Sequence, residues 1–399
     1  MIVHLRDEVE TVLRAWDKYE RDRNSPPIID YDCHPTDADV LPVGSRLEVF
    51  RRLTELRQRA DEAGEKQLIQ RINADLAYRR ALVGERAPLD EYVRATQGCP
   101  AAGWPEEYVT ACGELARKCL DALGVSWGPE TETQLKEAEG PLDVEKAPEA
   151  IRQAAAELEP LVRQATGANA PYDLSITTTH VDAYWSYWLD GAGQQVRLRL
   201  NLRNARFTKV RARQFALHEV LGHGLQSASL AERCAEEDVP WVRLLSVHAP
   251  HQVLLEGLAQ ALPLFITPDD EPLVTRVRLA HYLQLVYAEL HLAIDVGATA
   301  EECAEHARAR VPWWTDAEIA DALGDRSTDP LLRSYLWAYP AGLDWFIALA
   351  EAPDTVVREV LRAAYREPLT PDDLTILWPE GPAVGGPGGT VRLRKPAVP

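Results

Sequence analysis

Two histidines five positions apart flank a glutamate in the segment 216–224, and their spacing constrains the local fold more than any other feature of the chain. His218, Glu219 and His223 lie in an apolar stretch that predicts a helix over about residues 210–227. On an ideal α-helix, residues five apart point about 140° away from each other, whereas residues four apart differ by about 40°. The two imidazoles can therefore reach a common point only if the helix absorbs the extra residue as a π-bulge, a distortion often found at functional sites.

Side chains of these types at this spacing suit a catalytic zinc ion. Two neutral imidazoles can hold the metal, and the carboxylate of Glu219 can take a proton from its water. Gly222 lies inside the turn and is expected to tolerate the required backbone geometry best, because glycine has no Cβ. The alternative is that the motif has arisen by chance, with one histidine half-buried and the other exposed.

A catalytic zinc ion normally binds three protein ligands and leaves one position for water. Glu256 is the strongest candidate for the third ligand, because it is a lone carboxylate in the apolar helical run 251–260, where a charge is costly unless it is paired or bound to a metal. The alternative is that Glu256 lies on a helix surface. Other acids are weaker candidates, either because their surroundings are polar or because the first turn of a helix accounts for them: Glu232, Glu236, Glu237, Glu301 and Glu302.

The chain is strongly acidic, with a formal net charge of −19 over 399 residues. This charge argues against nucleic acid as the main partner and against binding to an anionic membrane surface.

Residues 1–8 lack the apolar core of a signal peptide, and no run reaches the length of a membrane span. The six cysteines are scattered without a CxxC pair, which is typical of free thiols in a reducing compartment. We therefore expect a cytoplasmic protein.

Hydrophobic periodicity predicts a mainly α-helical fold with two domains and a tail. Residues 1–167 are helix-periodic and charged, and we expect a helical N-terminal domain that serves as a scaffold or as one wall of a cleft. Residues 168–380 contain the candidate metal ligands and should form the zinc-binding catalytic domain. The Gly/Pro-rich stretch 381–399 predicts a flexible tail.

Strand patterns occur just before the expected metal helix. Residues 172–180 are rich in β-forming side chains, residues 182–189 are dense in aromatic side chains, and residues 196–203 alternate apolar with polar side chains. These patterns predict a small antiparallel sheet beside the metal helix. The aromatic run 184–188 could line a binding cleft, but aromatic side chains in strands usually belong to the core, and we favour the core.

Several polar side chains are candidates for contact with a substrate. Five of them could, by type, stabilise the charge that develops on a reacting carbonyl oxygen: Tyr335, Tyr339, His248, His251 and Arg333. Each of these types is also commonly structural. His251 precedes Glu256 by five residues on the same expected helix, so it could instead orient that carboxylate.

Positive charge is concentrated along and after the last expected strand: Arg197, Arg199, Arg203, Arg206, Lys209, Arg211 and Arg213. If this strand borders the cleft, an arginine from it could bind a substrate carboxylate in bidentate fashion. Arg197 and Arg199, on the polar face of the strand, are the candidates, together with Arg333. The alternative is a solvated polar face.

The metal motif resembles two groups of proteins. A glutamate on a helix after the histidine motif is the pattern of gluzincin zinc peptidases, and the spacing with Gly222 before the second histidine is similar to the HExxGH of dipeptidyl peptidase III. The EECRAE-like third-ligand motif of that family is not found here at a matching distance.

A second resemblance covers residues 177–349. His223-Gly224-Leu225-Gln226, the run from Glu256 to Ala259 and the later Tyr339-Pro340-Ala341-Gly342 are similar to a bacterial group of helical, zinc-peptidase-like proteins with HExxPGHHxQ, EGWALY and RYxxxPGQAxxY motifs. The resemblance implies a helical metallopeptidase-like architecture.

Carried over by position, the second resemblance implies His218, His223 and Glu256 as zinc ligands and Glu219 as base. The chain departs from that group at Gly342, where the group has glutamine, and near Trp345 and Phe346, where the group has tyrosine. The tyrosine that would steady the oxyanion is therefore either missing or supplied by Tyr335 or Tyr339.

These observations predict a zinc-dependent hydrolase that cleaves an amide bond in a peptide or a peptide-like small molecule, with Glu219 as general base. One alternative is a zinc enzyme that acts on a non-peptide metabolite in a biosynthetic pathway, which the departures from the bacterial group favour. Another is a degenerate peptidase that only binds. The presence of Glu219 argues against the second alternative, because metal binding alone does not require this carboxylate.

Overall fold

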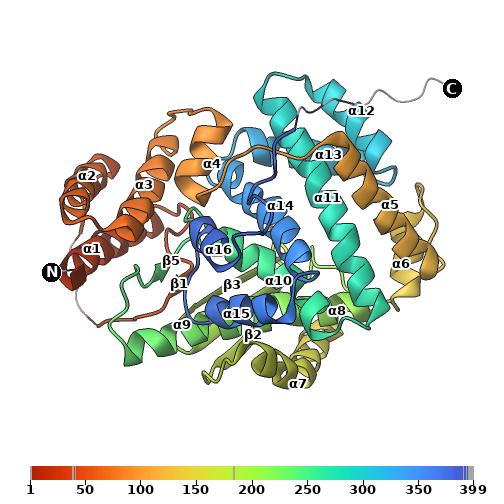
Figure 1. Cartoon of the computed structure of the whole chain (residues 1–399), viewed down its shortest axis with the longest axis horizontal. Coiled ribbons are helices and arrows are strands. Elements are labelled where there is room, and N and C mark those ends of the chain that lie inside the picture. The colour runs from red at the N-terminus through yellow and green to blue at the C-terminus, as the bar shows by residue number, and fades with distance from the viewer. Residues whose placement is uncertain are drawn as a thin grey trace.

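The fold was examined in a computed structural model that describes residues 2–37, 40, 42–182, 185–389, 391 and 393. It is mainly α-helical, as the sequence predicts, and it contains a small five-stranded sheet (Figure 1). The elements before the metal motif are α1 (Ile2–Arg21), β1 (Tyr31–Asp32), α2 (Arg46–Ala63), α3 (Lys66–Ala81), α4 (Leu89–Gln97), α5 (Glu106–Ala122), α6 (Thr131–Ala138), the 3₁₀ helix η1 (Val144–Lys146), α7 (Ala147–Thr166), β2 (Asp173–Thr179), β3 (Tyr187–Ala192) and β4 (Gln195–Asn201).

The remaining elements begin with the helical segment that carries the motif. They are α8 (Lys209–Phe215), the π-helix η2 (Ala216–Gly224), α9 (Leu225–Glu236), β5 (Leu244–Leu245), α10 (Gln252–Ile266), α11 (Glu271–Asp295), α12 (Ala300–Arg310), α13 (Asp316–Ser327), α14 (Leu332–Leu349), α15 (Asp354–Ala364) and α16 (Pro371–Leu377). None of the helices in the described part of the chain combines the length and the apolar character that a membrane crossing requires.

Local sequence signals explain where several helices begin. Thr299 caps α12 in a capping box, in which its hydroxyl accepts a hydrogen bond from the Glu302 backbone and the Glu302 side chain accepts one from the Thr299 backbone. Thr315 and Glu318 form the same arrangement at the start of α13. Glu302 therefore caps a helix, which agrees with the expectation that the first turn of a helix accounts for this carboxylate.

The sheet is mixed, and this corrects the expectation of an antiparallel sheet. The strand order is β2-β4-β3-β1-β5. β3 and β4 form the expected antiparallel hairpin, but β2 pairs with β4 in parallel, and β1 pairs with β3 in parallel. The two parallel pairings join strands that are not consecutive in the chain, and alternation within one strand does not specify its neighbour or its direction.

The alternation in β4 positions the sheet against the metal motif. Val196, Leu198 and Leu200 are buried, whereas the arginines between them are exposed. The buried face packs on η2, where a Cβ atom on Gly224 would lie 2.9 Å from Val196 Cγ1. The sheet therefore supports the helix turn that carries the second histidine.

Helix α10 lies in the middle of the molecule and packs against both η2 and α14 (Figure 1). Gly257 of α10 and Gly342 of α14 meet at the crossing, and a Cβ atom on either residue would collide with the backbone of the other helix. Gly342, which departs from the bacterial motif, therefore allows the two helices to approach closely. This crossing fixes the position of α14 relative to Glu256.

The apolar core forms two clusters. The smaller one joins α1, α2 and α3 with Val242 and Leu244, and these helices lie together at the N-terminal side of the molecule (Figure 1). The larger one contains residues on both sides of residue 167, from Tyr31 and Val93 to Val384. The division into domains at residue 167 stays a prediction.

The Gly/Pro-rich stretch differs from the expected flexible tail over residues 384–389. Val384 is buried, and the backbone of this segment forms hydrogen bonds with residues 102–103, including Gly103 N to Gly385 O at 3.3 Å and Gly388 N to Gly103 O at 3.2 Å. Gly385 has a φ of +87°, and its lack of a Cβ atom permits the close approach to Pro100 O. Glycine here serves packing rather than mobility. Residues 394–399 lie outside the described part of the chain.

Candidate metal centre

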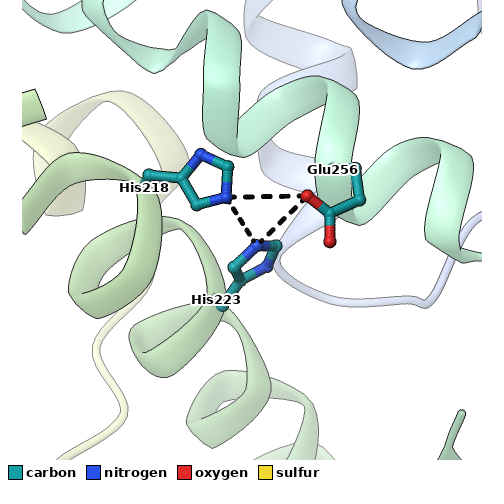
Figure 2. A group of neighbouring side chains, drawn as sticks. All are labelled: His218, His223 and Glu256. Atoms are coloured by element: carbon teal, nitrogen blue, oxygen red, sulfur yellow. Dashed lines mark hydrogen bonds and ion pairs between the residues drawn. The ribbon is translucent and has the colours of Figure 1, made fainter. Parts of the chain in front are cut away.

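The expected π-helical distortion is present in the segment that carries the histidines. Residues 209–236 form one helical stretch in which Ala216–Gly224 has π geometry. The wider turn brings His218 and His223 to the same side, with their Nε2 atoms 3.1 Å apart and their ring planes at 76° (Figure 2). The five-residue spacing therefore brings the two imidazoles together, because the backbone absorbs the extra residue.

Gly222 is required for a different reason from the one expected. Its φ is not among the positive values of the described glycines, so the backbone conformation alone does not demand glycine. A Cβ atom at this position would lie 2.8 Å from the Cβ atom of Ala259 on α10 and 2.9 Å from Leu217 O. Gly222 instead lets η2 approach α10 closely enough for Glu256 to reach the histidines.

Glu256 extends from α10 toward both imidazoles (Figure 2). Its Oε2 atom lies 3.5 Å from His218 Nε2 and 3.7 Å from His223 Nε2, distances longer than ordinary hydrogen bonds. We call His218, His223 and Glu256 the metal-ligand cluster. Each contributes one ligand atom, and these atoms all lie within 4.8 Å of one another.

The residues of this cluster fit a zinc ion. Tetrahedral coordination with bonds of about 2.0–2.1 Å places neighbouring ligand atoms roughly 3.4 Å apart, and the three separations here are 3.1, 3.5 and 3.7 Å. The Oε2 atom of Glu256 is buried and has no hydrogen-bond partner among the described residues. A buried carboxylate oxygen in this state is costly unless a cation occupies the space that it faces.

Two tyrosines of α14 support the cluster from the far side of Glu256. Tyr335 donates a hydrogen bond from its hydroxyl to Glu256 Oε1 at 2.5 Å, and the hydroxyls of Tyr335 and Tyr339 lie 2.7 Å apart. Burial and the Glu256 carboxylate raise the pKa of Tyr335 well above its ordinary value, so its hydroxyl remains a donor. Tyr335 therefore orients Glu256, and the hydroxyl of Tyr335 is already engaged by Glu256 and Tyr339.

Glu219 lies beside the cluster but is not part of it. The side chain is buried, and its Oε1 atom is 3.6 Å from His218 Nε2. Burial raises the pKa of Glu219 above its ordinary value, and the two histidines oppose this shift while Glu256 adds to it. A carboxylate with a raised pKa is suited to accept and later return a proton near neutral pH.

A cavity of about 360 Å³ opens next to these side chains. His218, Glu219 and Tyr339 form part of its lining. The rest of the lining comes from the start of β3, from the loop between β4 and α8, from α8 itself and from α10 and α11: Ser186, Tyr187, Asn204, Ala205, Arg206, Phe207, Arg211, Gln214, Phe215, Gln260 and Gln284. Tyr339 thus faces the space that a substrate would occupy, whereas Tyr335 does not line this cavity.

The structure does not bring the other expected substrate ligands to this cavity. Arg197 and Arg199 are exposed on β4 and both bind the carboxylate of Asp190 at 2.6 Å, because strand alternation directs them away from the buried face. Arg333 is buried and binds Asp295 Oδ1 at 2.7 Å. These three arginines therefore have structural partners outside the cavity lining.

The two candidate histidines before Glu256 also lie elsewhere. His251 is the N-cap residue of α10, where its Nε2 atom accepts a hydrogen bond from Ser246 N at 3.3 Å. His248 is bound to the buried carboxylate of Asp75 at 2.8 Å. Neither is therefore placed to stabilise charge on a reacting oxygen, and His251 is not a hydrogen-bond partner of Glu256.

Most of the aromatic and basic side chains that line the cavity are not the ones that the sequence singled out for substrate contact. Tyr187 belongs to the aromatic run expected in the core, but it is 46% exposed and packs edge-to-face on Phe215 in the cavity wall. Tyr184, in the same run, lies outside the described residues. Arg206 and Arg211 belong to the basic group recognised in the sequence, but they follow the strand rather than lie on it.

Comparisons with known proteins give similarity in fold alone. No family model matches the chain, and no curated protein matches it. Among solved structures, the fold is similar to that of a candidate lipoprotein from Colwellia psychrerythraea, with a TM-score of 0.51 and 14% sequence identity. The match covers 82% of this chain and 64% of that structure, so the chain spans less than two thirds of its neighbour's length.

Proposed function

We propose that the protein is a zinc-dependent hydrolase that cleaves an amide bond in a peptide or peptide-like small molecule. The observation that carries this proposal is the metal-ligand cluster, whose ligand atoms lie at separations suited to one zinc ion beside an unsatisfied oxygen of Glu256. His218, His223 and Glu256 would hold the ion, and when bound it supplies Lewis acidity at neutral pH.

The chain's own residues have distinct tasks in this proposal. Glu219 accepts a proton from the attacking water and returns it to the leaving amine, which its buried position beside His218 supports. Tyr339 lines the cavity and can donate a hydrogen bond to the oxygen that gains negative charge. Tyr335 is a positioning residue, because it acts on Glu256 rather than on substrate.

The test combines metal content with turnover. Purified protein should contain about one zinc ion per chain by elemental analysis and hydrolyse members of a peptide library. Glu219→Gln should retain the metal and lose about 10²- to 10⁴-fold in turnover, because it removes only the proton acceptor. His223→Ala should lose both, because it removes a metal ligand.

His180→Ala is the matched control, because His180 is exposed and its ion-pair partner in the described part of the chain is the exposed carboxylate of Glu145. It should retain both the metal and the activity. Absence of stoichiometric metal from the wild-type protein would refute the proposal. Unchanged turnover in Glu219→Gln would remove this residue from the mechanism. A parallel screen of non-peptide amides separates peptide substrates from other small molecules.

A further inference from the structure

The cavity beside the metal-ligand cluster has a charge opposite to that of the whole protein. The chain carries a formal net charge of −19, yet the charged side chains of the cavity lining are Arg206, Arg211 and Glu219. If Glu219 acts as the proton acceptor, the two arginines are the groups that remain for recognition. A cavity of this character concentrates anions rather than cations.

Arg211 is the arginine of this wall whose guanidinium forms neither an ion pair nor a hydrogen bond with the described residues. It lies on α8, and no carboxylate among the described residues forms an ion pair with it. Its neighbours differ, because Arg213 binds Asp270 at 2.5 Å and Arg276 of α11 binds Glu139. Arg206 directs its NH1 atom to the backbone carbonyls of Arg203 and Ala205.

The rest of the wall suits an apolar group attached to a polar chain. Phe215 packs edge-to-face on Tyr187 and on Phe207, with ring centroids 4.8 and 5.3 Å away. The side-chain amides of Gln260 and Gln284 also line the cavity and can pair with peptide groups. A cavity of about 360 Å³ is at the lower end of the range for small-molecule sites, so a short ligand fits better than a protein chain.

We propose that Arg211 binds a carboxylate of the substrate, so that the protein acts on short acidic or C-terminally free peptides with an apolar side chain near the cleaved bond. This inference rests on the proposed function for the position of the cleaved bond, but carboxylate binding itself does not depend on catalysis. A guanidinium can hold a carboxylate with two parallel hydrogen bonds, which fixes orientation as well as affinity. Arg211 takes the role that the sequence suggested for Arg197, Arg199 and Arg333.

The experiment measures binding separately from turnover. Two tripeptide libraries with identical side chains, one with free C-terminal carboxylates and one amidated, are incubated with Glu219→Gln protein, and retained peptides are identified by mass spectrometry. Free carboxylates, or amidated members that contain Asp or Glu, should be enriched. Arg211→Gln should reduce this enrichment about 10- to 100-fold, and Arg211→Lys should reduce it less, because lysine keeps the charge and loses the bidentate geometry.

Arg197→Gln is the control, because it removes the same charge from an exposed position outside the cavity lining. It should leave the enrichment unchanged, and thermal unfolding should show that every variant is folded. Enrichment of free acids only assigns the carboxylate to the C-terminus, and enrichment of amidated Asp or Glu peptides assigns it to a side chain. Retention of neither library, or equal enrichment with Arg211→Gln, overturns the inference. Enrichment without turnover in the wild-type protein would refute the proposed function alone.

Discussion

Helix α14 contributes to two buried groups of histidine and carboxylate side chains, and the two differ in how completely their polar atoms are satisfied. At one end, Tyr335 binds Glu256 in the metal-ligand cluster. Near the other end, Asp344 accepts hydrogen bonds from Trp104 at 2.8 Å and Tyr108 at 2.7 Å and lies 2.8 Å from His281 Nε2. We call Trp104, Tyr108, His281 and Asp344 the Asp344 cluster.

The difference separates a structural role from a binding role. Both oxygens of Asp344 have partners at hydrogen-bonding distance, so nothing further is needed to stabilise its charge. Oε2 of Glu256 has ion-pair distances of 3.5 and 3.7 Å to the histidines but no hydrogen-bond partner among the described side chains and backbone. A gap between close ligand atoms is the arrangement that a cation would fill, whereas a closed network holds helices together.

The largest expected effect is on the Asp344 cluster. Asp344→Ala should lower the free energy of unfolding by about 3–5 kcal/mol, because it leaves His281 and Trp104 buried without their partner. Metal content per folded molecule should not change. Urea unfolding and elemental analysis measure the two quantities, with exposed Glu380→Ala as the surface control. Loss of metal without loss of stability would contradict the structural role of Asp344.

The stability of the Asp344 cluster should also depend on pH. Burial opposes the charged form of His281, but the hydrogen bonds and charge interactions with Asp344 and Cys112 together outweigh it and raise the pKa of His281 to about 9 from an ordinary value near 6.5. Because the folded pKa lies above the unfolded one, this contribution is complete below about pH 6.5 and disappears as the pH rises through about 9, a change of about 3 kcal/mol.

Unfolding of the wild-type protein and of Asp344→Asn at pH 6 and pH 9.5 tests this dependence. The difference in stability between the two proteins should be larger at pH 6. The same difference at both pH values would mean that His281 is neutral in the folded protein.

A matched pair of tyrosine substitutions compares the two clusters directly. Tyr335→Phe should weaken zinc binding about 10- to 100-fold, because Glu256 loses the hydrogen bond that orients it. Tyr108→Phe removes the same group from Asp344, and it should lower stability by about 1–3 kcal/mol without affecting zinc affinity. Competition with a chromogenic chelator measures the affinity. Equal zinc affinity in the two variants would break the distinction between the clusters.

The smallest effect is expected at the exposed arginines of β4. Arg197→Gln combined with Arg199→Gln removes two ion pairs to Asp190 whose arginine side chains are more than half exposed. Such pairs contribute little, so stability should change by less than about 1 kcal/mol and peptide binding should be unaffected. Thermal unfolding and peptide-library binding check both points. A tenfold loss of peptide binding would return these arginines to the substrate site.

Part of the candidate site could be predicted from the sequence because its determinants are local. The five-residue spacing of His218 and His223 required a widened helix turn, and η2 provides it. The lone charge of Glu256 in an apolar helix indicated a buried partner, and the structure brings it to the histidines. The sequence could not separate the roles of Tyr335 and Tyr339. Nothing in the local pattern says which hydroxyl meets Glu256 and which one faces the cavity.

The sequence by itself therefore determined the helical character, the β3-β4 hairpin and the residues able to bind a metal, since these follow from side-chain chemistry and spacing within a few turns or strands. Only the tertiary structure decided that β2 joins β4 in parallel, that the glycine-rich segment packs on residues 102–103 and that Arg211 rather than Arg197 reaches the cavity. The physical reason is that these outcomes depend on which surfaces of distant segments meet, and periodicity within one segment specifies a buried face but not the partner that covers it.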